Sequence, residues 1–187
     1  MKNYLLLALS ALAIGGCATP DIFNENANEA TYVKTEDGNM IATTHKAAEN
    51  LMAQANYLQN DLKPILITSV ADITDLSSSS AFGLMVSEQL GDRFAQFGFP
   101  VIDLRTRHDV KVQVRNGEYM LSRDIQKISK KHAAGAVLLG TYTAGKNSVY
   151  VSTRLVRPSD NRILGSYNFE LPIGPDTKKM LKDVTPK

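Results

Sequence analysis

The last third of the chain constrains the fold most strongly, because three hydrophobic segments follow one another there at the spacing of a β-meander. Residues 136–142 are almost all apolar, which is typical of a central strand. Two segments with alternating apolar residues follow, at 149–155 and 163–169, and a turn at 158–161 separates them. The pattern predicts a C-terminal antiparallel meander whose first strand is central in its sheet.

Two amphipathic helices are expected earlier in the chain. The first is capped by Thr43 or Thr44 and runs to about Asn60, and the second runs from about Ser80 to Phe97. Gly98 stands in the position of a left-handed C-cap, and Gly91 within the second helix predicts close packing of another element. The inner faces repeat at helical spacing: Ala48, Leu51, Ala55, Leu58 and Leu62, then Phe82, Val86, Leu90, Phe94 and Phe97.

Strand patterns separate and follow these helices. Segments 65–70 and 100–104 are expected strands, and alternating valines at 110–114 precede Asn116-Gly117, which is typical of a tight hairpin turn before a return strand at 119–121. A third helix is expected between Ser122 as N-cap and Gly135. The order α-β-α-β-(ββ)-α-β-β-β predicts a single α/β (α+β) domain with one mixed sheet and about three helices.

The first sixteen residues have the parts of a secretory signal. Lys2 provides a positive charge, residues 4–14 form an apolar run, and two glycines precede Cys17. The apolar run is shorter than the roughly 20 residues that cross a membrane. The ending Ala-Ile-Gly-Gly-Cys17 resembles a bacterial lipobox, although Ile14 stands where leucine is usual. The resemblance implies a thiol that carries a diacylglyceryl group.

Cys17 is the only cysteine in the chain. Lipidation would explain why an exported chain has a single cysteine with no second cysteine to pair with. The alternative is that Cys17 is a buried free cysteine near a signal-anchor helix. Two or three acyl chains would anchor the protein permanently, since each buried CH₂ contributes about 0.8 kcal/mol. By analogy with enterobacterial lipoproteins, Ala18 after the cysteine indicates the outer membrane, because Asp there tends to retain lipoproteins at the inner membrane.

Charge divides the chain into segments. Residues 18–42 contain five acidic residues and one lysine, a net charge of −4, whereas residues 43–187 contain nineteen basic and fourteen acidic residues, a net charge of +5. The acidic stretch has few large apolar side chains and is expected to be a flexible tether. We therefore predict a signal peptide at 1–16, a lipidated N-terminus and tether at 17–42, and a folded domain at 43–187. The bases form no concentrated run of the kind that binds nucleic acid.

Patterns of catalytic or metal-binding residues are weak in this sequence. The histidines His45, His108 and His132 lack metal-ligand spacing, and there is no G-x-S-x-G nucleophile motif. Asp72 and Asp75 share a loop where a turn is favoured over a cation site. We predict no catalytic residues, no metal and no cofactor.

Two further patterns allow more than one interpretation. Residues 140–147 approximate a phosphate-binding loop, but Asn147 replaces the hydroxyl residue and a strand pattern follows, so a β-turn is favoured. A basic cluster after the second strand could bind an acidic partner or a glycan, but a solvated loop is the commoner outcome. It consists of Arg105, Arg107, His108 and Lys111.

Several segments resemble the FlgO family of flagellar outer-membrane lipoproteins. The likeness extends from about Ala47 to Phe169, and residues 117–124 and 140–142 are its most specific parts. The segments are AFGLMVSEQL (81–90), FAQFGFPVIDLR (94–105), NGEYMLSRD (116–124), VLLGTY (137–142) and VYVSTRLV (149–156). The domain also resembles the α/β module of the curli secretion lipoprotein and of lipoprotein activators of peptidoglycan synthases.

The resemblance implies a non-enzymatic role at the outer-membrane end of the flagellum. The first hypothesis is a collar or ring component that supports motility, with other collar proteins and copies of itself as partners and exposed sheet edges as contact surfaces. The alternative is a periplasmic regulatory module, such as an activator of a cell-wall synthase. A hydrolase is the third hypothesis, for which no nucleophile or metal pattern is present.

Overall fold

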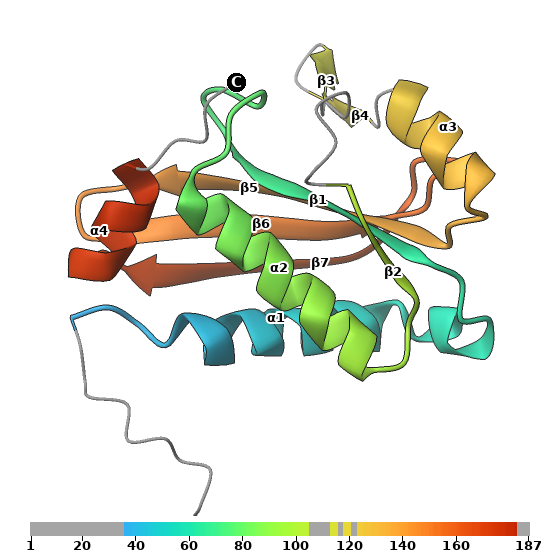
Figure 1. The fold of residues 1–187 in the computed structure, drawn as a ribbon, viewed down its shortest axis with the longest axis horizontal. Coiled ribbons are helices and arrows are strands. Elements are labelled where there is room, and N and C mark those ends of the chain that lie inside the picture. Colours follow the sequence, from blue (N-terminus) through green and yellow to red (C-terminus); the bar gives the residue numbers. More distant parts are fainter. Residues whose placement is uncertain (1–35, 105–112, 116–117, 121–122, 183–187) are drawn as a thin grey trace, which may run out of the picture. The chain divides into compact units, whose positions relative to one another are not determined.

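The computed structural model describes residues 36–104, 113–115, 118–120 and 123–182 (Figure 1). The predicted signal peptide and residues 17–35 of the predicted tether lie outside these residues. The elements, in chain order, are α1 (Met40–Gln54), the short 3₁₀ helix η2 (Asn56–Asn60), β1 (Ile65–Asp72), α2 (Ala81–Gln96), β2 (Val101–Asp103), β3 (Gln113–Arg115), β4 (Glu118–Met120), α3 (Arg123–Lys131), β5 (Ala136–Ala144), β6 (Ser148–Val156), β7 (Ile163–Pro172) and α4 (Pro175–Lys182).

One five-stranded mixed sheet organises the domain, in the order β2-β1-β5-β6-β7. β1 pairs in parallel with both β2 and β5, whereas β5, β6 and β7 form an antiparallel meander. The apolar segment at 136–142 lies in β5, the middle strand, as predicted. The predicted fold class is therefore confirmed.

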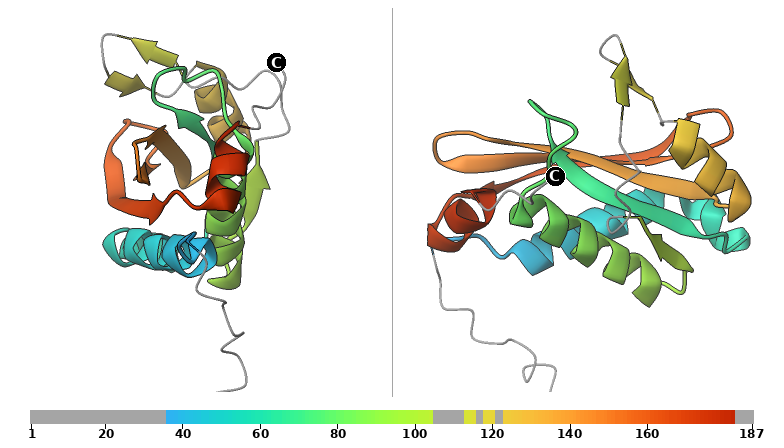
Figure 2. Two further views of the ribbon diagram at one scale, coloured as in Figure 1. Left: turned by 90° about the vertical axis from the view of Figure 1, so that its left-hand side faces the viewer. Right: turned by 45° about the horizontal axis from the view of Figure 1, so that its top comes forward.

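The two faces of the sheet are covered unequally. α1 and α2 lie side by side along one face and enclose the larger core, which includes Leu51, Phe82 and Phe94 (Figures 1 and 2). On the other face α3 contributes Ile125 to a smaller core with Leu66 and neighbouring residues of β5. α3 therefore covers only part of the second face. No helix within the described residues is long and apolar enough to span a membrane.

The first helix differs from its prediction at both ends. It begins at Met40, because the side chain of Asn39 accepts the N–H of Ala42 at 2.9 Å, and Thr43 and Thr44 lie inside the helix. The α-helix ends at Gln54 and η2 continues the chain. Leu62, predicted on the inner face, lies beyond both elements and is 49% exposed. Residues 36–42 of the predicted tether therefore belong to the folded domain.

The second helix begins at Ala81 with Ser80 as its N-cap, within one residue of the prediction, and Gly98 adopts the left-handed conformation with φ +87°. A Cβ on Gly91 would lie 3.2 Å from Ile67, which confirms the predicted close packing of another element, and that element is β1. Phe97 is not part of the core: it is 40% exposed, and the Arg93 guanidinium lies 5.0 Å from its ring centre. The helical stripe ends one turn before Phe97, because the α-helix itself ends at Gln96.

Three other predictions concern the second half of the chain. β3 and β4 pair antiparallel as predicted, with Arg115 opposite Glu118, while the turn residues 116–117 and the proposed cap Ser122 lie outside the described residues. Gly135 does not end α3, because the helix stops at Lys131 and Ala133 takes the positive φ of 50°. α4 was not predicted from the sequence at all.

Candidate functional site

The loop after β1 forms turns at both of its aspartates. The Asp72 carboxylate accepts the N–H and the hydroxyl of Thr74 at 2.8 and 2.7 Å, and Asp75 accepts the N–H and hydroxyl of Ser77 at 3.1 and 2.6 Å. These are Asx turns, as the sequence favoured. Nowhere in the described ranges do three or more His, Cys, Asp or Glu side chains group in a way that could hold a metal ion.

The segment that approximates a phosphate-binding loop is a β-hairpin. Gly140 lies within β5 opposite Thr153, and the N–H of Gly145 donates to the Ser148 carbonyl at 2.8 Å. A phosphate loop needs a helix that begins at its lysine, whereas here β6 follows. The β-turn interpretation is confirmed.

The remaining candidate residues are separated or lie outside the described part. His45 is half-buried in α1, and His132 follows α3, where its buried Nε2 has no hydrogen-bond partner among the described residues. His108 and the basic cluster of Arg105, Arg107 and Lys111 lie outside the described residues, as does Cys17. Lipidation of Cys17 and binding by the basic cluster therefore stay predictions.

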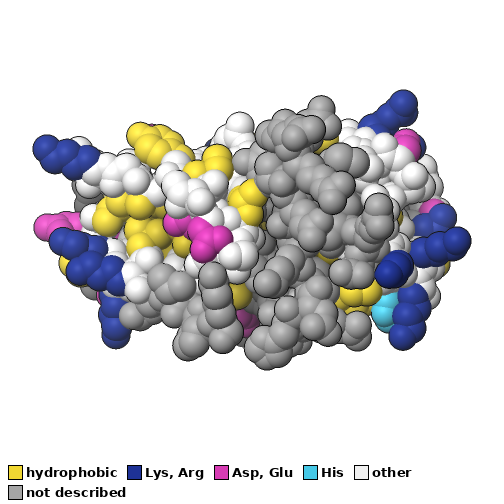
Figure 3. Space-filling view, turned by 90° about the horizontal axis from the view of Figure 1, so that it is seen from above, with side chains coloured by type: hydrophobic (Ala, Val, Ile, Leu, Met, Phe, Trp, Pro, Cys, Tyr) yellow, Lys and Arg dark blue, Asp and Glu magenta, His cyan; other side chains and the backbone are white. Residues whose placement is uncertain are grey.

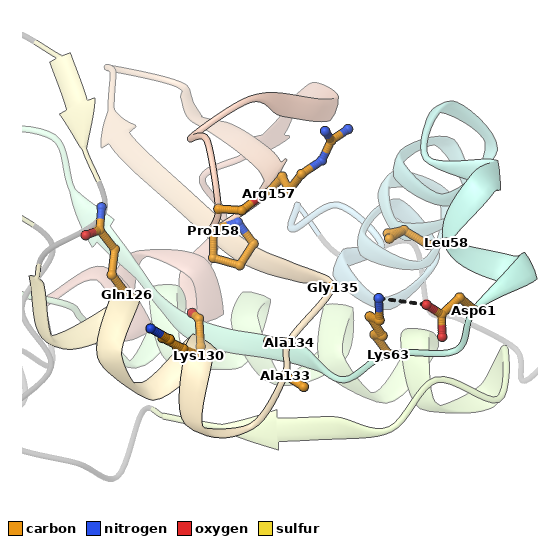
Figure 4. Close-up of a pocket in the computed structure, with 12 residues that line it drawn as sticks. Leu58, Asp61, Lys63, Gln126, Lys130, Ala133, Ala134, Gly135, Arg157 and Pro158 are labelled. Carbon is orange, nitrogen blue, oxygen red and sulfur yellow. Dashed lines mark ion pairs between the residues drawn. The ribbon is translucent and has the colours of Figure 1, made fainter.

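A cleft of about 750 Å³ lies at the end of the sheet where β1 and β5 begin (Figure 4). Four segments form its walls: η2 with the linker to β1, the second half of α3, the connection from α3 to β5, and the β6–β7 turn. The lining residues are Leu58, Asp61, Lys63, Gln126, Ser129, Lys130, Ala133, Ala134, Gly135, Arg157, Pro158 and Ser159.

The cleft combines an apolar centre with a cationic rim. Leu58, Ala134 and Pro158 provide the apolar part, whereas the charged lining residues are three bases and one acid, a net charge of +2. The Lys63 ammonium pairs with the Asp61 carboxylate at 2.7 Å (Figure 4). Such exposed pairs contribute only about 0–1 kcal/mol, so a carboxylate of a partner can replace the internal one. The cleft is therefore suited to an acidic partner with apolar side chains.

Close backbone contact between distant segments creates the bottom of this cleft. The N–H of Gly135 donates to the Pro64 carbonyl at 2.9 Å, and a Cβ on Gly135 would lie 2.9 Å from the Cβ of Lys63. The cleft was not predicted from the sequence, because its walls come from segments near residues 60, 130 and 157. The glycine was the only local signal, and it was assigned to the end of a helix.

A second, shallower depression of about 470 Å³ lies on the face of the sheet that α3 leaves uncovered. Tyr150, 53% exposed, and Ile73 line it, with Tyr150 directly opposite Glu170 on β7 and Thr143 on β5. Figure 3 shows hydrophobic side chains gathered on this side of the molecule, toward the end opposite α3.

The outer edge of β7 is partly occupied. The Gln54 side chain donates to the Ser166 carbonyl at 2.9 Å and accepts the Ser166 N–H at 3.1 Å, as a residue of a neighbouring strand would. Unpaired groups on edge strands are templates for pairing with another chain. α1 therefore blocks part of a sheet edge, and exposed sheet edges were the predicted contact surfaces.

A family model described as FlgO protein matches residues 45–176. The chain belongs to the FlgO family. The matched range of this FlgO chain includes α2, the whole sheet, the cleft and the start of α4, while α1 begins five residues before it. No curated protein matches the sequence.

Three solved structures are similar to the FlgO chain in fold. The LpoB C-terminal domain from Salmonella enterica is 18% identical, with a TM-score of 0.45, over 68% of this chain and 96% of that one. Lipoprotein GNA1162 from Neisseria meningitidis is 15% identical, with a TM-score of 0.41, over 62% and 83%. The PelC dodecamer from Paraburkholderia phytofirmans is 13% identical, with a TM-score of 0.40, over 60% and 72%.

Proposed function

We propose that this FlgO-family chain is a non-enzymatic outer-membrane lipoprotein that assembles at the flagellar basal body as a collar component and supports motility. The observation that carries the proposal is the family match over residues 45–176, which covers most of the chain. The signal-like first sixteen residues and the lipobox-like ending at Cys17 support the envelope location.

The proposed anchor is lipid on Cys17, on the periplasmic face of the outer membrane. Residues 18–35 lie between Cys17 and the first described residue, Glu36. A flexible chain of that length spans roughly 21–25 Å on average. Such a reach keeps the domain close to the membrane, as a collar around the outer end of a rotating shaft requires.

The folded domain supports a role in assembly through its surfaces. Among the described residues, the cationic cleft and the depression beside Tyr150 are the surfaces proposed to contact partners. Because Gln54 blocks part of the β7 edge, we assign assembly to side-chain surfaces of the domain and not to strand addition at β7. Other collar proteins and further copies of the chain are the proposed partners.

The experiment is a Cys17→Ser strain, tested by swimming assay, membrane fractionation and imaging of the basal body. We expect unprocessed or misplaced protein and poor swimming, because the thiol that carries lipid is absent. Ala18→Asp is a matched control that keeps the lipid and, by the enterobacterial rule, moves the protein to the inner membrane. Normal swimming with correctly placed Cys17→Ser protein would refute the anchoring.

The alternative function, a periplasmic regulatory module such as an activator of a cell-wall synthase, makes a different prediction for a deletion strain. That strain would swim normally and incorporate cell-wall precursors abnormally. A collar component predicts the reverse, with impaired swimming and ordinary cell-wall synthesis.

A further inference from the structure

Charge is distributed unevenly over the folded domain. Around the cleft, residues 125–131 of α3, the linker before β1 and the β6–β7 turn carry six bases and two acids, a net charge of +4. We call this surface the basic end: Lys63, Lys127, Lys130, Lys131, Arg157 and Arg162, with Asp61 and Asp160. Figure 3 shows Lys and Arg side chains with a His at the end that carries α3.

The opposite end also carries lysines, but its charges balance. α4 has three lysines, and Lys146 lies in the β5–β6 hairpin, whose Asn147 carbonyl accepts the N–H of Ile173 in the segment before α4. Four acids at the same end offset them: Glu36, Asp37, Glu170 and Asp176. Among the described residues the net charge there is zero, so of these two ends only the one around the cleft is strongly positive.

The segment from β1 to β2 is acidic. Residues 64–104 contain five acids and one base, a net charge of −4, and the base, Arg93, forms an ion pair with Glu49 of α1. On α2 the exposed residues Met85, Glu88 and Asp92 follow one another at helical spacing, and Met85 is 39% exposed. We call these three residues the α2 face.

We propose that the basic end of one copy binds the α2 face of a second copy. The α2 face presents two carboxylates beside an exposed apolar side chain, and the cleft presents cations around the apolar residues Leu58, Ala134 and Pro158. Opposite potentials on facing surfaces guide association and set its register. The inference rests on the proposed function in one respect, that a collar requires contacts between copies.

The two surfaces differ, and this determines the kind of assembly. An interface that joins one patch to a different patch is heterologous, so each copy uses both patches and the contact repeats from copy to copy. Such a contact produces a ring when its rotation closes, and it does not stop at a dimer. A symmetric dimer that joins α2 to α2 is disfavoured by like charges at Glu88 and Asp92.

A disulfide test exploits the fact that Cys17 is the only cysteine of the chain. The full-length protein with Asp92→Cys and Lys130→Cys is oxidised in envelope membranes and run without reductant. We expect a ladder of dimers, trimers and larger species. Each single variant gives no species beyond a dimer, and Asp92→Cys with Lys179→Cys on α4 is the matched control that gives no ladder.

Charge reversal tests the same interface independently. One variant reverses the basic end (Lys130→Glu with Lys131→Glu), and the other reverses the α2 face (Glu88→Lys with Asp92→Lys). Each alone weakens self-association of the full-length protein in detergent by about tenfold or more in sedimentation, and mixing the two restores it. Lys178→Glu with Lys179→Glu is the control, which leaves self-association unchanged.

The outcomes separate this interface from the proposed function. Absence of the ladder, together with reversed variants that behave like the original chain, overturns the interface even if the protein is found at the flagellar base. An adduct of the Asp92→Cys or Lys130→Cys variant with a different protein, in place of the ladder, also overturns it. A ladder formed by protein that lies away from the flagellum supports the interface and contradicts the proposed function.

Discussion

The Asp37 carboxylate accepts the backbone N–H of Thr177 at 2.8 Å and so caps a helix 140 positions further along the chain. It also accepts the N–H of Asp176 at 3.0 Å. The residue before α4 is Gly174, which has no side chain to serve as cap, and a Cβ there would lie 2.5 Å from the Asp37 backbone nitrogen. The start of the described chain is thereby joined to the last helix.

Replacement of Asp37 by alanine should lower the free energy of unfolding by about 1 kcal/mol at neutral pH, the usual contribution of a helix cap. The Asn variant should retain most of it, because an amide oxygen also accepts N–H groups. Chemical denaturation of the full-length variants would measure both. A loss that is equally large for Asn and Ala would show that the cap hydrogen bonds are not its source.

The same carboxylate should make stability depend on acid pH. Partial burial raises the pKa of Asp37, but the hydrogen bonds from Thr177, Asp176 and Gly174 outweigh it, and the pKa lies below the usual 3.8. Between the folded-state pKa and about pH 3.8, the unfolded chain therefore binds more protons than the folded chain. The contribution of Asp37 to the free energy of unfolding is present above about pH 3.8 and is lost as pH falls through the folded-state pKa. The difference in free energy of unfolding between the original chain and the Asp37→Ala variant should therefore become smaller below pH 3.8.

Ser87 should be more important for stability than its size indicates. The register of β1 against β5 shifts between Ile67 and Val70, and the N–H of Val70 donates to the Ser87 hydroxyl at 2.8 Å. Ser87→Ala leaves that buried N–H without a partner, and we expect a loss of about 1–3 kcal/mol in thermal or chemical unfolding.

Ser129 is the matched control for this prediction. The buried Ser129 hydroxyl donates to the Ile125 carbonyl at 2.7 Å, and the Ser87 hydroxyl donates in the same way to the Gly83 carbonyl at 2.7 Å. Among the described residues, however, no strand N–H donates to the Ser129 hydroxyl. Ser129→Ala should therefore lower the free energy of unfolding by less than about 1 kcal/mol. Equal losses for the two variants would contradict the role of the Val70 contact.

Gln54→Ala should expose the β7 edge at Ser166. We expect the free energy of unfolding to fall by about 1 kcal/mol, because the two hydrogen bonds are lost. We also expect more association between copies at high concentration, because an open strand edge can pair with the strand of another chain. Light scattering against concentration would measure the association. Asn50→Ala is the control, because the Asn50 side chain donates to the Lys46 carbonyl within α1.

Two glycines should respond differently to alanine. A Cβ on Gly165 would lie 2.9 Å from the Leu51 carbonyl oxygen, so Gly165→Ala forces α1 away from β7 and should lower stability by about 1–3 kcal/mol. A Cβ on Gly91 would come closest to the Ile67 side chain, at 3.2 Å. Because alanine favours a helix by about 1 kcal/mol over glycine, Gly91→Ala should be close to neutral. Unfolding curves that show the opposite order would contradict the packing of α1 on β7.

Much of the sheet and its main helices could be predicted because their signals are local. The apolar run at 136–142 and the alternation at 149–155 indicated a central strand and its partner, and the stripe from Phe82 to Phe94 indicated the buried face of α2. These patterns arise because neighbouring residues face the same core at the period of their element. The prediction that the buried stripe extends to Phe97 was wrong, because Phe97 follows the last helical residue, Gln96.

The candidate site was not predictable in the same way. The residues near Leu58 form no pattern that predicts a cleft with the segments around residues 130 and 157. α4 was missed for a related reason: its cap is Asp37, and its short polar sequence contains only two large apolar residues, Met180 and Leu181.

The alternation of helices and strands, the mixed sheet with β5 at its centre and the resemblance to the FlgO family could all be inferred from local patterns, because each depends on side chains that are close along the chain. The position of the basic end, the contact of Gln54 with the edge of β7 and the Asp37 cap of α4 became visible only in the folded domain. The physical reason is that each of these depends on contacts between segments that approach only when the sheet has formed.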